Sequence, residues 1–359
     1  MTFLIAAAGT GGHVFPGLSV GEALLDLGVG SDEIVYVGGD RLESTIYPGH
    51  GFRFLQIELA GLKRSLSMSN ARIPAVVIRA RRRISEEMAK LGTGVVLGMG
   101  GYVTIPAALA ARRNRVPFFN AEQNAEAGLA NKVTARWARE SFVSFPRTGG
   151  LPGGRWVGNP VRKVFWSFDR ARLRPHGLED YGLSADTFVV GVFGGSLGAS
   201  SINEAVATML GTWDGPPLQV VHLTGPTHLE TMSTRTPGAG VVWRRIGFEE
   251  SMERFYAVSD VVVSRAGGAV AELTATGTPA ILVPGRFGSG GHQSGNARVL
   301  EETGAALVLE QEELAGLGSV LTSLLTGPGL LATMSAATRA IAKPEAARTI
   351  ARTMIETIR

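Results

Sequence analysis

The sequence predicts an α/β protein made of two Rossmann-like domains, each built on a parallel sheet. Three observations support this class. Short apolar runs rich in β-branched residues alternate with longer helical stretches, which is typical of β-α-β units. Residues 146–186 interrupt the alternation with closely spaced prolines and glycines, and the alternation restarts after them. The length of 359 residues also suits two domains of ordinary size.

The first half carries the first series of expected strands and one well-marked helix. We expect this helix to begin at Pro16, which is a favourable first helical residue, and to end at Gly28. Between them, apolar residues recur at helical spacing, so one face should pack on the sheet. The expected strands are 3–8, 33–37, 53–57, 94–97 and 117–120.

The second half repeats the pattern and closes with another helix. Two open α/β halves of this kind would face each other across a ligand cleft at the carboxyl ends of their strands. Residues 345–358 carry apolar residues at steps of four and predict a terminal amphipathic helix. The expected strands are 188–193, 219–223, 240–244, 261–264 and 280–283.

Composition excludes several classes of protein. Hydrophobic residues make up 45% and charged residues 18%, which argues against disorder. The chain has no cysteine, so disulfides and cysteine-ligated metals are excluded. The net charge of +4 does not indicate a nucleic-acid partner, and no apolar run approaches the roughly 20 residues of a membrane span. We therefore expect a cytoplasmic protein.

Glycine-rich turns follow three expected strands, at 9–12, 98–101 and 194–198. The first precedes a helix, and free amides at a helix start favour a phosphate or a hydroxyl-rich ligand. A dinucleotide fingerprint fails because Val14 stands at its third glycine. His13 ends this turn, where an imidazole could take a proton from a bound hydroxyl. The alternative is a histidine that only caps the loop, on glycines that only allow close packing.

A second class of enzyme also fits part of the sequence. Residues 194–198 match G-x-S-x-G, the nucleophile elbow of serine hydrolases, with Ser196 as the nucleophile. Asp260 and His292 follow in the matching chain order. This alternative leaves the first 186 residues unexplained. The six histidines show neither H-E-x-x-H nor another metal-binding spacing, so we expect no metal site.

Seven ordered blocks of the sequence form one pattern. They are 9–17 (GTGGHVFPG), 98–103 (GMGGYV), 122–132 (EQNAEAGLANK), 157–162 (VGNPVR), 194–203 (GGSLGASSIN), 264–272 (SRAGGAVAE) and 292–297 (HQSGNA). Taken together, these blocks closely resemble the MurG family of bacterial cell-wall glycosyltransferases. The resemblance covers nearly the whole chain. Several positions depart from the family pattern, namely Ala8, Ala121, Leu197 and Gly291, and the segment 265–272 is one residue short.

The resemblance implies the GT-B fold and a specific reaction. N-acetylglucosamine would pass from UDP-N-acetylglucosamine to the 4-hydroxyl of the muramyl residue of lipid I, forming lipid II for peptidoglycan. The N-terminal domain, 1–160 joined by a helix at 343–359, would bind the acceptor on the membrane side. The domain 161–342 would bind the UDP-sugar. The enzyme would act at the cytoplasmic face of the bacterial membrane as a peripheral protein.

The family pattern also implies roles for individual residues. His13 would be the catalytic base, with Glu122 as a second candidate. Ser196 would face the diphosphate, Phe248 the uracil and Glu272 the ribose. The remaining expected contacts are Arg162 and Arg265 near the nucleotide, Thr10, Gly11, Gly12, Asn124 and Gln293 around the sugar, and Gly100, Gly101 and Tyr102 in the acceptor loop.

Such a reaction needs a base for the attacking hydroxyl and stabilisation of the departing diphosphate. Glycine amides and arginine can supply the second without a metal, so we expect no required cofactor. A single displacement would invert the anomeric centre. The alternatives are a GT-B transferase with another sugar or lipid acceptor, the serine hydrolase, and an inactive sugar-nucleotide binder.

Residues 63–83 combine seven basic residues with apolar ones and contain no acidic residue. Such a segment suits an anionic lipid surface, because basic residues are attracted to it and apolar neighbours enter the headgroup region. We expect it to dock the N-terminal domain on the membrane. The alternative is a solvated helix face. The basic residues are Lys63, Arg64, Arg72, Arg79, Arg81, Arg82 and Arg83.

Overall fold

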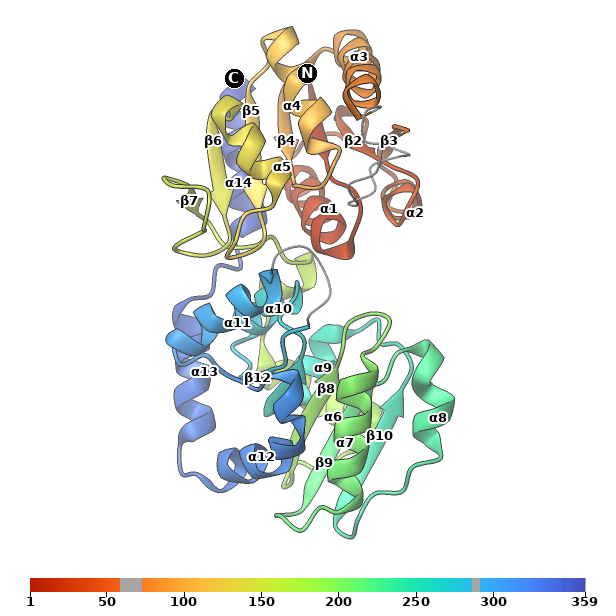
Figure 1. Cartoon of the computed structure of the whole chain (residues 1–359), viewed down its shortest axis with the longest axis vertical. Coiled ribbons are helices and arrows are strands. Elements are labelled where there is room, and N and C mark those ends of the chain that lie inside the picture. The colour runs from red at the N-terminus through yellow and green to blue at the C-terminus, as the bar shows by residue number, and fades with distance from the viewer. Residues whose placement is uncertain (59–72, 286–290, 359) are drawn as a thin grey trace. The chain divides into compact units, whose positions relative to one another are not determined.

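The computed structural model describes residues 1–58, 73–285 and 291–358. The chain divides into two compact units (Figure 1). Unit 1 comprises Met1–Lys163 and Lys343–Arg359, and unit 2 comprises Val164–Ala342. The predicted α/β class with two parallel-sheet domains is confirmed.

Unit 1 is built on a seven-stranded parallel sheet with the order β3-β2-β1-β4-β5-β6-β7. The strand order reverses between β1 and β4, which pair directly, so the loops after these two strands flank a topological switch point. The strands are β1 (Thr2–Ala6), β2 (Ile34–Gly38), β3 (Arg53–Gln56), β4 (Thr93–Gly98), β5 (Phe118–Glu122), β6 (Glu140–Val143) and β7 (Arg155–Trp156).

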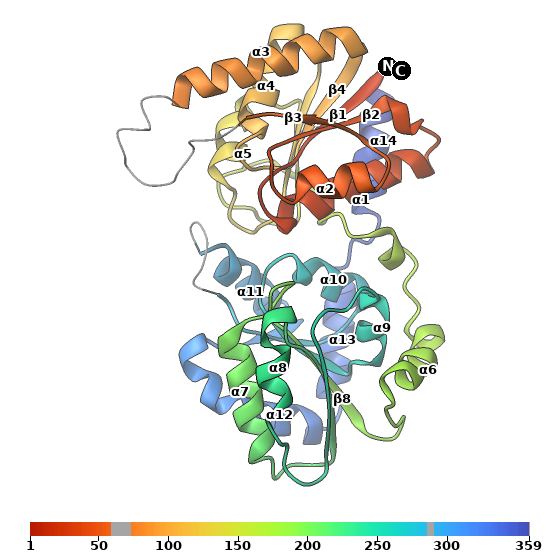
Figure 2. The same ribbon diagram turned by 90° about the vertical axis from the view of Figure 1, so that its right-hand side faces the viewer.

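Helices cover both faces of this sheet (Figure 2). Helices α1, α2 and α14 lie on one face, and α3 and α4 lie on the other, where apolar side chains of β1, β2 and β4 are buried beneath them. The helices are α1 (Gly11–Asp26), α2 (Glu43–Gly49), α3 (Ile73–Leu91), α4 (Thr104–Asn114), α5 (Leu129–Thr134) and α14 (Ala346–Ile358), with 3-10 turns at Ser31–Glu33 and Ala135–Trp137.

Helix α14 belongs to unit 1 although it ends the chain. Its apolar positions Ala346, Ile350 and Met354 are buried, as the spacing of four predicts. At its start, Arg348 donates a hydrogen bond of 2.7 Å to Asp26 at the end of α1. Lys163 contacts the same carboxylate at 2.9 Å, so three separate segments of unit 1 meet there.

Helix α1 begins five residues earlier than its expected start at Pro16. Thr10 is the N-cap, and its carbonyl accepts the amides of His13 and Val14 at 2.9 and 3.1 Å. Pro16 therefore lies inside the helix, where it cannot donate to the carbonyl of Gly12. Because the helix starts at Gly11, His13 lies in its first turn. The predicted end at Gly28 is confirmed to within two residues, with a φ of +90° at that glycine.

Unit 2 is built on a six-stranded parallel sheet with the order β10-β9-β8-β11-β12-β13. Its switch point lies between β8 and β11, which pair directly. The strands are β8 (Phe188–Phe193), β9 (Leu218–Leu223), β10 (Val241–Ile246), β11 (Val261–Ser264), β12 (Ala280–Leu282) and β13 (Ala306–Val308).

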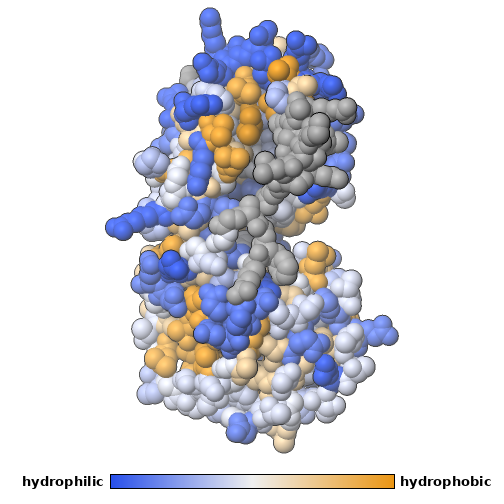
Figure 3. All heavy atoms as spheres, in the orientation of Figure 1, coloured by the Kyte–Doolittle hydropathy of each residue, from blue (hydrophilic) through white to orange (hydrophobic). Residues whose placement is uncertain are grey.

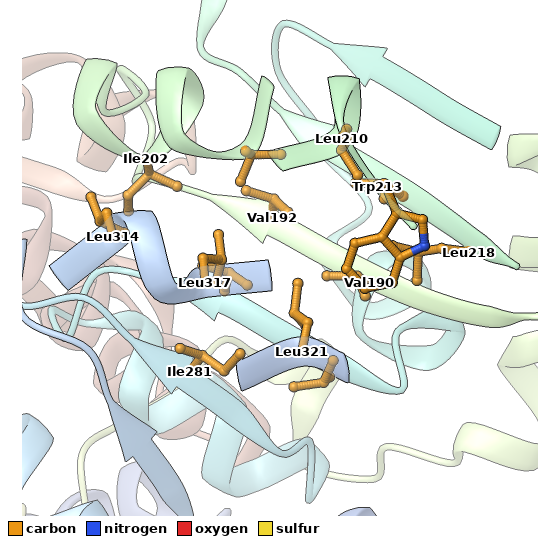
Figure 4. Packing of buried hydrophobic residues seen from close by; sticks show 14 of the residues in the cluster. Val190, Val192, Ile202, Leu210, Trp213, Leu218, Ile281, Leu314, Leu317 and Leu321 are labelled. Atoms are coloured by element: carbon orange, nitrogen blue, oxygen red, sulfur yellow. The ribbon is translucent and has the colours of Figure 1, made fainter. Parts of the chain in front are cut away.

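One hydrophobic cluster of unit 2 lies between the sheet and helices α7 and α12 (Figure 4). Val190 and Val192 of β8 pack there against Ile202 and Leu210 of α7. The helices are α6 (Arg170–Tyr181), α7 (Ser200–Gly211), α8 (Leu229–Ser233), α9 (Met252–Val258), α10 (Ala269–Thr276), α11 (His292–Glu302), α12 (Leu317–Thr326) and α13 (Leu330–Ala340), with 3-10 turns at Lys163–Phe165, Pro226–His228 and Gln311–Gly316.

Hydrophobic side chains are exposed on both units among a mostly polar surface (Figure 3). Across the described ranges, no single helix combines the length and apolar character needed to cross a membrane. The pair Gln311–Thr326 and Leu330–Ala340 meets these criteria only when both helices are counted together, and a bend of 93° separates them.

Candidate functional site

In unit 1, the loops at the switch point bring Thr10, His13 and Gly100 together. The Oγ1 atom of Thr10 lies 3.2 Å from Nδ1 of His13, within hydrogen-bond distance. The Nε2 edge of the ring lies against the loop after β4, because a Cβ built on Gly100 would be 3.0 Å from Nε2 of His13. The ring is thus held between two loops at the carboxyl end of the sheet.

The loop after β4 needs its two glycines for this close approach. Gly100 and Gly101 have φ angles of +89° and +74°, which favour glycine. A Cβ on Gly101 would lie 2.7 Å from the carbonyl oxygen of Ala8, so no larger residue fits without a shift. Tyr102 follows, with 39% of its surface exposed. Gly11 and Gly12 lie in the first turn of α1 beside the same site.

Glu122 ends β5 and is buried, with 3% of its surface exposed. Its Oε1 accepts hydrogen bonds from the backbone and side-chain amides of Asn124, both at 3.0 Å. Its Oε2 accepts from the amide of Gly128 and the side chain of Asn131, both at 2.9 Å. Four donors therefore hold this carboxylate, which favours a role in fixing the loop before α5 over a role as base.

Glu43 is a buried carboxylate at this site that the sequence patterns did not indicate. It opens α2 and is 1% exposed. Its two oxygens accept the backbone amides of Gly9 and Gly39 at 3.2 and 2.9 Å. It thereby connects the loops after β1 and β2.

In unit 2, the loops after β8, β9 and β10 present an exposed surface at the carboxyl end of the sheet. Ser196 is exposed in the loop after β8. Two apolar residues are also largely exposed, Leu197 at 77% and Phe248 at 57%. The loops after β8 and β9 contact each other, since a Cβ on Gly198 would overlap the carbonyl oxygen of Thr224 at 2.0 Å.

Arg265 follows β11, and its guanidinium donates hydrogen bonds to oxygens of the protein itself. Its terminal nitrogens donate to the carbonyls of Val283 and Pro284 at 3.1 and 3.2 Å, and to Ser201 and Gln311 at 2.8 and 3.0 Å. Burial lowers the pKa of this guanidinium. These contacts favour a role in joining the loops around the switch point over direct binding of a nucleotide.

Glu272 and Gln293 lie near the other side of the same switch point. Oε2 of Glu272, in the first turn of α10, accepts a hydrogen bond of 3.0 Å from the buried hydroxyl of Tyr256, a residue that the sequence patterns did not indicate. The side-chain oxygen of Gln293 accepts the amide of Gly285 at 2.7 Å. A Cβ on Gly267 would lie 4.0 Å from Nε2 of Gln293, next to the loop after β11.

Arg162 belongs to unit 1 and lies near α1. Burial raises the pKa of Glu22 in that helix, and the positive charges of His50, Lys163 and Arg162 oppose the shift. Arg162 is thus part of unit 1, whereas Ser196, Phe248, Arg265 and Glu272 are part of unit 2.

The serine hydrolase alternative is contradicted. Asp260 accepts the amide of Val189 at 2.9 Å, at the amino end of β8, whereas Ser196 follows the carboxyl end of the same strand. The intervening strand spans roughly 20 Å at about 3.3 Å per residue, so these two residues cannot belong to one triad. Arg170 and Arg174 form ion pairs with Asp260 at 2.7 and 3.2 Å.

Among the residues that the structure describes, no group of three or more histidines and carboxylates could hold a metal ion. Of the expected site residues, Thr10 and His13 in unit 1 and Ser196 and Arg265 in unit 2 follow the carboxyl ends of strands at the two switch points. This is where open α/β sheets bind their ligands.

Comparison with known proteins connects both units to one family. The profile of the glycosyltransferase family 28 N-terminal domain matches residues 3–143, and that of its C-terminal domain matches residues 189–352. A protein of Mycobacterium sp. strain JLS is 38% identical, over 100% of this chain and 96% of its own length. The chain belongs to glycosyltransferase family 28.

Other relatives match over a similar length. A protein of Cupriavidus necator is 37% identical, over 98% of this chain and 96% of its own length. The crystal structure of MurG from Acinetobacter baumannii has a TM-score of 0.80 and 27% identity, over 99% of this chain and 100% of that one. Both sequence relatives are named as the UDP-N-acetylglucosamine–N-acetylmuramyl-(pentapeptide) pyrophosphoryl-undecaprenol N-acetylglucosamine transferase. The predicted resemblance to the MurG family and the GT-B fold class are confirmed.

Proposed function

We propose that this glycosyltransferase moves N-acetylglucosamine from UDP-N-acetylglucosamine to the 4-hydroxyl of the N-acetylmuramyl residue of lipid I, with inversion. The observation that carries the proposal is the full-length match, at 37–38% identity, to proteins named for this transfer. The chain is a hexosyltransferase by its family. The identity of the donor and of the acceptor is what we add to this family assignment.

We assign the acceptor to unit 1 and His13 to the role of base. The contact of 3.2 Å between Thr10 and Nδ1 of His13 supports this assignment. If Nδ1 carries the proton and donates it to Thr10, the lone pair lies on Nε2, beside Gly100. This nitrogen would then accept the proton of the attacking hydroxyl. The hydrogen bonds that saturate Glu122 favour His13 over that second candidate.

We assign the donor to unit 2. Glu272, oriented by Tyr256, would accept hydrogen bonds from the ribose hydroxyls, and exposed Phe248 would cover the uracil. The glycine loop that carries Ser196 would hold the diphosphate with its backbone amides, while Arg265 keeps the neighbouring loops in place. Gln293 would contact the sugar.

We further propose that the N-terminal part of α3 docks on an anionic membrane. Lys63, Arg64 and Arg72 lie outside the described residues. From residue 74 to residue 79 no side chain is buried, and Ile78 is 45% exposed. Arg79, Arg82 and Arg83 are exposed and Arg81 is partly buried. Exposed apolar and basic side chains on one helix suit a lipid headgroup region.

Release of UDP tests the donor and acceptor together. The protein is incubated with UDP-N-acetylglucosamine, with and without a short-chain lipid I analogue. We expect UDP release that requires the analogue and that falls strongly when UDP-N-acetylgalactosamine or UDP-glucose replaces the donor. Release that is independent of the analogue would contradict the proposal.

A further inference from the structure

We propose that Glu43 is a positioning residue that orients His13 through the loop after β1. The inference rests on the proposed function, in which His13 is the base. Glu43 is 1% exposed, and its carboxylate accepts the amides of Gly9 at 3.2 Å and Gly39 at 2.9 Å. Neither the expected reaction nor the resemblance to relatives assigns this side chain a role.

A carboxylate suits this position better than other side chains. It accepts hydrogen bonds at two oxygens and donates none, so it can hold two amides from two different loops. A glutamine of the same shape would direct its own N–H groups at one of these amides. The space is also tightly filled, since a Cβ on Gly38 would lie 2.7 Å from Cγ of Glu43. The side chain therefore has little freedom to move.

The connection from Glu43 to His13 is short. Gly9 has a φ of +105° and directly precedes Thr10, the extended N-cap of α1. The carbonyl of Thr10 accepts the amide of His13 at 2.9 Å, and its hydroxyl contacts Nδ1 of the same residue at 3.2 Å. A rotation of the peptide at Gly9 would displace both contacts. Glu43 opposes that rotation by accepting the Gly9 amide.

Contacts with α1 and β2 hold helix α2, and with it Glu43, in place. The hydroxyl of Tyr47, one turn further along α2, donates to the carbonyl of Val14 at 3.2 Å. Its ring stacks on Tyr36 with a centroid separation of 3.8 Å, and Tyr36 donates to the carbonyl of Gly17 at 3.0 Å. Helix α2 is thus joined to α1 directly after His13, while Glu43 holds the loop before it.

The test is a double-mutant cycle between Glu43→Gln and His13→Ala. In the wild-type background we expect Glu43→Gln to lower kcat roughly 10-fold to 100-fold, the loss typical of a small misplacement of a reacting group. In the His13→Ala background it should cause no further loss, because its effect acts through His13. UDP affinity measured by calorimetry should not change. Glu356→Gln, an exposed position on α14, is the matched control and should retain wild-type turnover.

With folded variants, three outcomes would overturn the inference. They are an equal loss of turnover in both backgrounds, a loss of UDP affinity, and wild-type turnover of Glu43→Gln. If Glu43→Gln does not fold, Glu43→Asp replaces it in the cycle, because its carboxylate is one methylene too short to hold both amides. Failure of both variants to fold would assign Glu43 a general structural role. Wild-type protein without acceptor-dependent transfer would instead contradict the proposed function.

Discussion

At the scale of single residues, both the chemistry and the position of His13 fit the proposed role of base. It lies in the first turn of α1, contacts Thr10 through Nδ1 and lies beside Gly100 through Nε2. Both loops flank the switch point of the unit 1 sheet, and two positive-φ glycines let them approach each other. A proton acceptor at that position can act on a hydroxyl that binds at the edge of the sheet.

We predict that His13→Ala lowers kcat by roughly 100-fold to 10,000-fold, as expected for the loss of a positioned base. Steady-state kinetics with the lipid I analogue measure this loss, and calorimetry with UDP should show unchanged donor affinity. Near-normal turnover would mean that another group acts as base.

We predict that Glu272→Gln weakens UDP binding about 10-fold, because an amide accepts from both ribose hydroxyls less well than a carboxylate. Tyr256→Phe, which removes the hydroxyl bonded to Glu272 but keeps the ring, should weaken it about 2-fold to 10-fold. Calorimetry measures both. If both variants bind UDP as the wild type does, the carboxylate does not contact the nucleotide.

Sequence reasoning could find residues in local patterns but not residues that act across the fold. His13 stands in a glycine turn between a strand and a helix, which is a pattern that can be read directly. Glu43 and Tyr256 contact partners 34 and 16 residues away, and only the packing of α2 and α9 brings them together. The hydrogen bonds that occupy Arg265 were hidden for the same reason, since its partners lie 18 to 64 residues away. The partners of Glu122 lie only 2 to 9 residues away, and it is the conformation of the loop before α5 that directs them at the carboxylate.

At the scale of elements, the ten strands that follow the alternating pattern were predictable, including the edge strands β3 and β10, and three short strands were not. The ten expected strands are present with ends within about two residues. Strands β6, β7 and β13 were missed, because they have four, two and three residues and lie at or near sheet edges. The polar residues Glu140 and Arg155 interrupt the apolar pattern of β6 and β7, so pairing with neighbouring strands rather than propensity decides that these two strands form.

Helix α3 carries a prediction about membrane binding. Changing Arg79, Arg81, Arg82 and Arg83 to Glu should abolish salt-sensitive co-sedimentation with anionic vesicles, because it replaces attraction by repulsion. UDP affinity should be retained. The same four positions changed to Lys preserve the charge and should preserve binding. Undiminished binding by the folded Glu variant would contradict docking through α3.

Strand β9 carries a prediction about pH. Burial lowers the pKa of His222 to about 3, and Nε2 contacts Asn203 of α7 at 3.0 Å. The unfolded chain, with a histidine pKa of about 6.5, binds a proton that the folded chain does not. The stability from this neutral histidine is therefore present above pH 6.5 and falls by about 1.4 kcal/mol per pH unit as the pH drops toward 3.

Hydrogen exchange of the β9 amides between pH 7.5 and 4.5 measures this change. The wild type should lose protection as the pH falls, after correction for intrinsic exchange. His222→Gln should show a shallower slope, and its value at pH 7.5 gives the cost of the substitution itself. Parallel slopes for the two proteins would contradict the assignment.

At the scale of the whole molecule, two units repeat one topology. The first six strands of each sheet follow the same order, with the reversal between the first and fourth strand of the unit. In both units, the loops that follow the first and the fourth strand contain glycines and flank that reversal. The proposed division of labour, acceptor in unit 1 and donor in unit 2, uses this repeated site twice with different side chains.

The product of the reaction tests this account most directly. The protein is incubated with labelled UDP-N-acetylglucosamine and a lipid I analogue, and the anomeric configuration of the isolated product is assigned by NMR. We predict a disaccharide in which N-acetylglucosamine is joined in β-configuration to the 4-hydroxyl of the muramyl residue. An α-linked product, a linkage to another hydroxyl, or UDP release without a disaccharide would contradict it.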